Sequence, residues 1–95
     1  MSDLRPASTV YATITESGGM LLDVRGRGRW YALNCSGALW WRHLSEGTPA
    51  DEAADAVAAY FGADPEQVRT DMRSLAQQLY ERRMMRTPSR WRWHR

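Results

Sequence analysis

The sequence predicts an α+β domain in which a three-stranded antiparallel sheet is followed by three helices. The first third of the chain is rich in β-branched and aromatic residues that alternate with a period of two, as in strands. From residue 35 onward, apolar residues recur at spacings of three and four, as in amphipathic helices. Because the helices have only the sheet to pack on, we expect them to cover one of its faces.

Three short segments are predicted as strands joined by tight turns. The first spans residues 9–15 and ends at a Glu-Ser-Gly-Gly turn, and the second spans residues 20–24. The Arg-Gly-Arg-Gly-Arg turn of residues 25–29 leads into the third, residues 29–34. We expect Leu22 and Leu33 to be buried under the helices, so the three strands form an antiparallel meander.

The first helix is predicted to begin after residue 34 and to end at Gly47. Asn34 or Ser36 can accept a hydrogen bond from a free backbone N–H at its start. Trp40 and Trp41 are adjacent, so their side chains point about 100° apart on a helix. We therefore expect Trp40 to be buried and Trp41 to be partly exposed.

The second and third helices each begin near a proline. The second is predicted to start with Pro49 at its first position and to run to Phe61, before Gly62. Its predicted apolar face consists of Ala53, Ala54, Val57, Tyr60 and Phe61. The third is predicted to start at Asp64-Pro65, with an acidic first turn. Its predicted buried stripe consists of Val68, Met72, Leu75 and Leu79.

Length and composition argue against catalysis and against a bound cofactor. A single domain of 95 residues buries only about 60% of the surface of its unfolded chain, which leaves little room for an internal active site. The only cysteine, Cys35, cannot form an intramolecular disulfide, and with His43 and His94 it does not make a zinc site. Cys35, Ser36 and His43 on one short helix do not place a nucleophile, a base and an orienting group in turn. We predict no enzyme, metal or cofactor.

The ends of the chain predict a protein that is neither exported nor membrane-spanning. Residues 1–8 lack the apolar core of a signal peptide and are predicted as an N-terminal tail. No run approaches the roughly 20 apolar residues that cross a bilayer. With a single cysteine, a reducing cytoplasm is the expected location. Residues 86–95, which include Trp91 and Trp93 between arginines, show no packing period and are predicted as a flexible basic tail.

Two features are compatible with nucleic-acid binding. All 13 basic residues are arginine, a side chain suited to phosphate, although genome base composition also explains this usage. The turn of residues 25–29 lacks the strand-loop-helix context of a phosphate-binding loop, and a hairpin turn needs its glycines in any case. The tail tryptophans could stack on bases. A nucleic-acid binder that uses the third helix and this turn remains the alternative.

The third strand is the more informative feature, because it forms an edge of the predicted sheet. If Tyr31 and Leu33 face the core, Trp30 and Ala32 face away from it, and the free N–H and C=O groups of the edge can receive another strand. The third helix could form a far wall. The predicted peptide-binding residues are Arg29, Trp30, Tyr31, Ala32, Leu33 and Asn34 on the strand, and Arg69, Met72, Arg73, Ala76 and Tyr80 on the helix.

A family resemblance covers residues 9–85. It is carried by the order and spacing of Leu21-Leu22-Asp23, Tyr31, Leu33-Asn34, Gly37, Leu39-Trp40, Leu44, Gly47, Ala53-Ala54, Phe61-Gly62, Asp71 and Leu79. This pattern resembles the PqqD-like family, the RiPP recognition element, and most of all the stand-alone members encoded with lasso peptides. The family usually ends its third helix with Gly before a Leu pair. Here Glu81-Arg82-Arg83 precedes Met84-Met85, so a longer helix is expected.

The resemblance implies a winged-helix-like fold and a non-catalytic function as a peptide chaperone. In this family the leader of a ribosomally made precursor peptide adds as a strand to the third strand and lies against the third helix. The implied partners are the leader peptide, a transglutaminase-like leader peptidase and an asparagine-synthetase-like macrocyclase. A third reading is an adaptor subunit that Trp41 and the tail hold on a larger enzyme.

Overall fold

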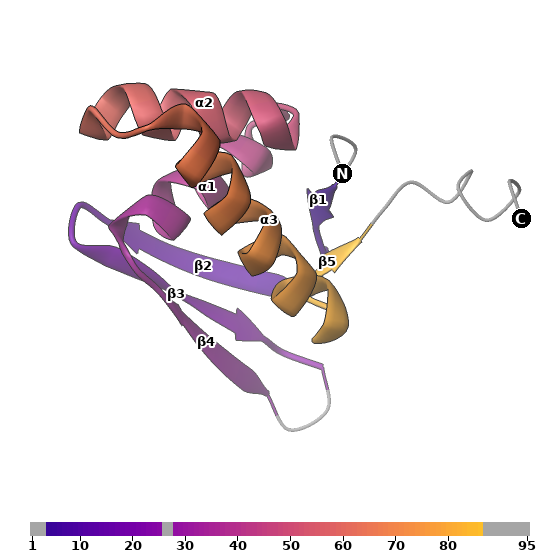
Figure 1. The fold of residues 1–95 in the computed structure, drawn as a ribbon. Helices are drawn as coiled ribbons and strands as arrows, with labels where there is room; N and C mark the ends of the chain where they lie inside the picture. Colours follow the sequence, from indigo (N-terminus) through magenta and orange to yellow (C-terminus); the bar gives the residue numbers. More distant parts are fainter. Residues whose placement is uncertain (1–3, 26–27, 87–95) are drawn as a thin grey trace, which may run out of the picture.

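The computed structural model describes residues 4–25 and 28–86 and confirms the α+β class (Figure 1). The main sheet has the order β2-β3-β4, with β2 at Val10–Thr15, β3 at Gly18–Asp23 and β4 at Arg29–Leu33, all antiparallel. The helices are α1 at Cys35–Ser45, α2 at Ala50–Phe61 and α3 at Pro65–Glu81. Figure 1 shows the three helices on one side of the sheet, as the sequence predicts. Gly26, Arg27 and the tail residues 87–95 lie outside the described residues.

The sheet has one face toward the helices and one face toward solvent. Leu21 pairs with Tyr31 in the ladder, and Leu21 and Leu33 are buried under the helices. Leu22 pairs with Trp30, so both lie on the opposite face, where Leu22 is only half-buried. The expectation that Leu22 enters the core is therefore wrong. Adjacent leucines on a strand point to opposite faces, and Leu21 is the one that points inward.

Helix α1 crosses the sheet and is buried on two sides. Its start is capped by Asn34, whose side-chain oxygen accepts a hydrogen bond from the Gly37 N–H at 2.8 Å. Trp40 is buried and donates from Nε1 to the Ala50 carbonyl oxygen at 3.1 Å. Trp41, expected to be partly exposed, is only 2% exposed. Because α1 contacts both α2 and a further strand, β1, the core covers more than one of its sides.

Helix α2 supplies the small residues of the core but not its aromatic ones. Pro49 is the N-cap rather than the first helical residue, and Gly62 ends the helix in a left-handed conformation. Ala53, Ala54 and Val57 are buried as expected. Tyr60 and Phe61 are instead exposed; their rings pack edge to face, with centroids 4.9 Å apart. They border an open pocket with Ile14 and Leu39 instead of entering the core.

Helix α3 follows the predicted buried stripe with one exchange. Val68, Met72 and Leu79 are buried, while Ala76 is fully buried and Leu75 only half-buried. The helix ends at Glu81, so the expected extension is not observed. The turn after it places Arg83 at a φ of 62°, the left-handed conformation that favours glycine. This turn directs the buried side chains Met84 and Met85 back into the core.

A second, two-stranded sheet brings the two ends of the described chain together. Strand β1 at Arg5–Pro6 pairs antiparallel with β5 at Met85–Arg86. The Ala7 N–H donates to the Met84 carbonyl oxygen at 3.0 Å, and the Leu4 side chain is buried. This pair was not predicted from the sequence, and the domain limits at residues 8 and 85 stay a prediction. Within the described part of the chain, no helix has both the length and the apolar character to cross a bilayer.

Candidate peptide-binding site

The outer side of β4 carries main-chain groups that point away from the sheet. The Leu33 carbonyl oxygen points toward β3, because it lies 2.7 Å from the position that a Cβ on Gly18 would take. Hydrogen-bonding direction alternates along an antiparallel strand, so the N–H and C=O groups of Trp30 and Ala32 point outward. Within residues 4–25 and 28–86, no strand pairs with this side of β4. An added strand can therefore bond to Trp30 and Ala32.

The side chains of β4 alternate between the two faces of the sheet as the sequence predicts. Leu33 is buried and Tyr31 is half-buried against the core, both toward the helices. Trp30 is 66% exposed, and Ala32 is also exposed, on the opposite face. Asn34 follows the strand as the cap of α1. A strand added to β4 therefore meets Tyr31 on one face and Trp30 on the other.

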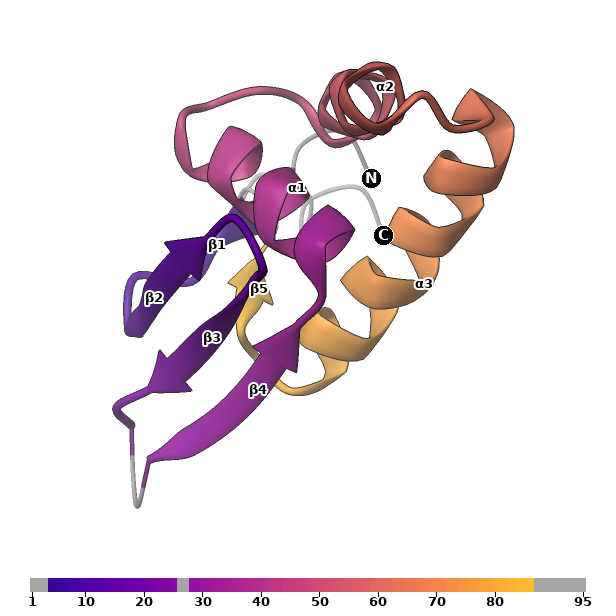
Figure 2. The ribbon, with the colours of Figure 1, turned by 90° about the vertical axis from the view of Figure 1, so that its left-hand side faces the viewer.

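Helix α3 runs beside β4 on the helix side of the sheet (Figure 2), and long side chains connect the two. The Tyr31 hydroxyl donates to Gln78 Oε1 at 2.6 Å, and the Arg82 guanidinium lies over the Tyr31 ring, 5.1 Å from its centroid. One turn nearer the start of α3, Leu75 Cδ2 lies 3.1 Å from the position that a Cβ on Gly37 of α1 would take. The glycine therefore permits the close approach of α3 to α1. We call the outer side of β4 together with Leu75, Gln78 and Arg82 the β4–α3 edge.

The helix residues expected to bind the peptide lie elsewhere. Met72 and Ala76 are in the core, 6% and 0% exposed, so they do not form an accessible wall. Arg69 and Arg73 form ion pairs with two aspartates of α2, as described next. Tyr80 is 49% exposed. At 100° per residue these side chains lie around a different part of the helix from Leu75, Gln78 and Arg82.

The arginines of α3 that face α2 are neutralised there. Arg69 donates from Nε and Nη2 to the two carboxylate oxygens of Asp55, at 2.8 and 2.7 Å. Arg73 Nη2 lies 3.6 Å from Asp51 Oδ1. The hydrogen bonds from Arg69 lower the pKa of Asp55, and the same bonds raise the pKa of Arg69. The charges of this face join two helices, which weakens the nucleic-acid alternative.

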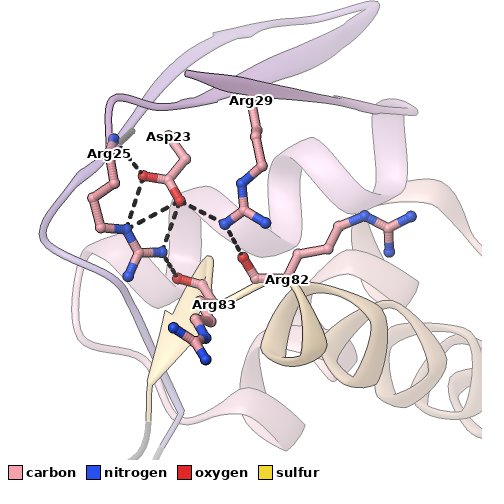
Figure 3. A network of polar contacts seen from close by, with 5 residues as sticks. All are labelled: Asp23, Arg25, Arg29, Arg82 and Arg83. Atoms are coloured by element: carbon pink, nitrogen blue, oxygen red, sulfur yellow. Dashed lines mark hydrogen bonds and ion pairs between the residues drawn. The ribbon is translucent and has the colours of Figure 1, made fainter. Parts of the chain in front are cut away.

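A network of polar contacts around a buried carboxylate lies where β4 begins and α3 ends (Figure 3). We call this the lower end of the β4–α3 edge. Asp23 is 0% exposed and accepts from Arg25 Nη2 at 2.7 Å and from Arg29 Nη2 at 2.9 Å. The same Arg25 nitrogen donates to the Arg83 carbonyl oxygen at 2.6 Å, and Arg29 Nη2 donates to the Arg82 carbonyl oxygen. The bonds from the Arg25 side chain hold the pKa of Asp23 far below its usual range. We call Asp23, the side chains of Arg25 and Arg29, and the carbonyl groups of Arg82 and Arg83 the Asp23 clamp.

The Asp23 clamp explains why the turn of residues 25–29 has arginine at both of its ends. It was not predicted from the sequence. A buried charge is stable only when it is paired and hydrogen-bonded, and here two guanidinium groups satisfy one carboxylate. Both arginines also bind carbonyl groups at the carboxyl end of α3, where the helix dipole favours positive charge. The available signal was an aspartate at an inward-facing strand position, followed by arginines two and six residues later.

The adaptor reading loses one of its two contacts. It relied on an exposed Trp41, which is buried, and on the tail, which lies outside the described residues. Among the residues that the structure describes, no group of three or more His, Cys, Asp or Glu side chains is arranged to hold a metal ion.

The chain matches one protein family and two solved structures. The sequence model of the family described as coenzyme PQQ synthesis protein D (PqqD) matches residues 18–85. The structure of TbiB1 in complex with the TbiA(beta) leader peptide is similar, with a TM-score of 0.77 and 22% identity, over 90% of this chain and 98% of that one. Lasso peptide synthetase B1 complexed with the leader peptide has a TM-score of 0.74 and 24% identity, over 88% and 98%. The search of curated proteins found no match.

Proposed function

Because this chain belongs to the PqqD family, we propose that it binds the leader segment of a ribosomally synthesised precursor peptide of the lasso type. The leader would add as a strand to β4 and lie against α3. In this proposal the chain acts in trans in the cytoplasm, without catalysis of its own. It presents the precursor to a transglutaminase-like leader peptidase and an asparagine-synthetase-like macrocyclase.

The outward main-chain groups of Trp30 and Ala32 carry this proposal. Their N–H and C=O groups can bond to the main chain of a peptide of any sequence, while neighbouring side chains add selectivity. Leu75, Gln78 and Tyr31 lie on the helix side of the edge, and Trp30 lies on the solvent side. Support also comes from the two solved structures of similar fold, each described as a complex with a leader peptide.

The main-chain contribution can be tested with a proline on the proposed edge and a matched proline on the opposite edge. Ala32→Pro removes an outward N–H, and edge strands tolerate proline where the N–H faces solvent. Ala12 is its counterpart on the outer side of β2. The Thr13 carbonyl oxygen points toward β3, 3.0 Å from the position of a Cβ on Gly19, so the groups of Ala12 point outward.

The probe is a fluorescein-labelled leader peptide of a lasso-type precursor, to be sought among the genes that flank the gene for this chain. Its affinity is measured by fluorescence polarisation. We expect Ala32→Pro to weaken binding at least about tenfold, the effect of losing roughly 1.4 kcal/mol, and Ala12→Pro to leave it unchanged. Circular dichroism should show both variants folded. Equal affinities of Ala32→Pro and the unchanged chain would refute strand addition at β4, and a probe that does not bind the unchanged chain would refute leader recognition.

Delivery to the processing enzymes is tested separately. A transglutaminase-like leader peptidase is incubated with the full precursor, with and without this chain. We expect the chain to accelerate leader cleavage, and Ala32→Pro to remove the acceleration while Ala12→Pro retains it. Cleavage at the same rate without the chain would limit its function to binding.

A further inference from the structure

We propose that the lower end of the β4–α3 edge is a receptor for one carboxylate side chain of the bound peptide, formed by the guanidinium groups of Arg29 and Arg82. This inference rests on the proposed function and specifies the chemistry of its ligand. It predicts that the leader carries an Asp or Glu at one defined position of the added strand.

Arg29 is held in place before any peptide binds. Its Nη2 donates to the buried Asp23 carboxylate at 2.9 Å and also to the Arg82 carbonyl oxygen. Its other donor nitrogens, Nε and Nη1, have no partner among the residues that the structure describes. The side chain is half exposed, so these donors can meet a ligand. Fixing one nitrogen reduces the rotamer entropy that an arginine loses when it binds a carboxylate.

Arg82 supplies a second guanidinium on the same face of β4. It lies over the Tyr31 ring, 5.1 Å from the centroid, and its Nη1 makes only a long contact of 3.5 Å to the Gln78 carbonyl oxygen. In the described part of the chain Arg82 forms no ion pair, unlike Arg69 and Arg73 on the α2 side. The adjacent acid, Glu81, accepts from Gln77 one turn back on the helix.

The local charge favours an anion. Asp23 carries one negative charge and is paired with two positive ones, Arg25 and Arg29, and Arg82 adds a third positive charge over Tyr31. The partial negative charge at the carboxyl end of α3, about half a unit, offsets only part of the difference. A carboxylate that reaches Nε or Nη1 of Arg29 and the guanidinium of Arg82 would form charge-assisted hydrogen bonds in a partly desolvated position.

The strand register places one peptide side chain at this receptor. Residues directly opposite on neighbouring strands share a face, with Cβ atoms about 5 Å apart. Arg29 and Tyr31 are two residues apart on β4 and both point to the helix side. A peptide residue opposite Arg29 therefore also points to that side, where Arg29 and Arg82 present their guanidinium groups, and an Asp or Glu side chain can extend toward them. Its sequence neighbours point to the solvent side and cannot.

A free strand edge beside the two guanidinium groups favours a peptide over a nucleic acid. The main-chain groups of Trp30 and Ala32 match a peptide backbone, which a phosphate backbone would leave unsatisfied. Phosphate binding by the same arginines would make the interaction fall steeply with salt and would need no defined residue position. The two possibilities therefore give different results in one experiment.

The test uses the labelled leader probe in a neutral form, with every Asp and Glu replaced by its amide. A single Glu is then introduced at each position in turn, and affinity for the full chain is measured by fluorescence polarisation. We expect Glu to tighten binding about tenfold at one position and not at the positions on either side of it. Arg82→Gln should abolish that gain. Arg42→Gln, an equal change of charge at an exposed position of α1, should retain it.

The results distinguish a failure of the carboxylate receptor from a failure of the proposed function. Binding of the neutral probe with no position favoured by Glu would overturn the carboxylate receptor and leave leader recognition intact. Loss of the gain in both arginine variants would overturn it as well, because net charge alone would then explain the effect. A single-stranded DNA oligonucleotide that displaces the probe would assign the arginines to phosphate. No binding of any leader form, including the unmodified one, would refute the proposed function itself.

Discussion

The two sides of α3 use arginine in opposite ways. Toward α2, Arg69 and Arg73 are paired with Asp55 and Asp51, so their charge contributes to holding two helices together. Toward β4, Arg82 lies over Tyr31 without an acidic partner among the described residues. The same residue type on one helix is thus structural on one side and available to a ligand on the other. The residue type alone does not separate the two uses, since all three are arginines; the neighbouring element does.

The buried stripe between these two sides gives the largest predicted effect. Met72→Asp places a charge at a position that is 6% exposed, so we expect the protein to lose more than about 4 kcal/mol and to unfold. Met72→Leu, which conserves volume, should cost less than about 1.5 kcal/mol. Circular dichroism with urea denaturation measures both. A folded Met72→Asp variant that has lost leader binding would instead place Met72 in the binding surface.

Stability at low pH should distinguish Asp23, which pairs with arginines near β4, from Asp55, which pairs with an arginine of α3. Both pKa values are lowered, so their stabilisation is complete above the ordinary Asp pKa of about 4 and is lost as the pH falls toward the folded values. Asp23 is fully buried, whereas the Asp55 side chain is 42% exposed and solvent screens its pair. We expect Asp23→Asn to lower the melting temperature at pH 7 by more than about 5 °C and Asp55→Asn by less. Thermal melts from pH 7 to pH 2 should show a weaker acid loss in Asp23→Asn than in the unchanged chain; equal profiles would contradict the role of the Asp23 clamp.

A pair of arginine variants tests the comparison directly. Arg69→Gln should lower the melting temperature by a few degrees and leave leader affinity unchanged, because it removes a link between two helices. Arg82→Gln should leave the melting temperature within about 2 °C and weaken binding of an acidic leader. Differential scanning fluorimetry and fluorescence polarisation on the same samples give both values. If both variants lose affinity equally, the two sides of α3 are not distinct in function.

The turn after α3 gives the smallest effect, and it is stabilising. Arg83 has a φ of 62°, a conformation that costs a non-glycine residue about 1 kcal/mol. Arg83→Gly removes that strain and keeps the carbonyl that accepts from Arg25, although glycine adds entropy to the unfolded chain. We expect a net gain of about 0.5 kcal/mol in urea denaturation. A loss of stability would show that the Arg83 side chain makes a contact worth more than the strain.

Local signals predicted most of the fold. Alternation located the three strands of the main sheet, and Asn34 and Asp64 are the helix caps. The strands β1 and β5 were missed because a two-residue strand has no period to detect. The exposure of Trp41 was predicted wrongly. The angle between neighbouring residues shows that their side chains point in different directions, but it does not show how many sides of α1 the rest of the fold covers. Burial of both tryptophans required knowing that β1 also packs on α1.

The strand half of the predicted site is an open edge of the sheet, whereas Met72 and Ala76 of its helix half are buried. An edge strand follows from order alone, since β4 is the last strand of a meander. A helical wheel shows which stripe of α3 is apolar, but it does not show whether a flank faces α2 or β4. That choice depends on Asp55 and Asp51, which precede Arg69 and Arg73 by 14 and 22 residues. The Asp23 clamp joins residues as far as 58 positions apart, which no local pattern contains.

The pairing of β1 with β5 has a consequence for engineering. Arg5 lies opposite Arg86, so polypeptide attached before the first strand and after the last one leaves the domain at neighbouring points. A domain with adjacent entry and exit can be inserted into a surface loop of another protein without stretching its host. The fold is therefore suited to insertion as a cassette into a surface loop of another enzyme.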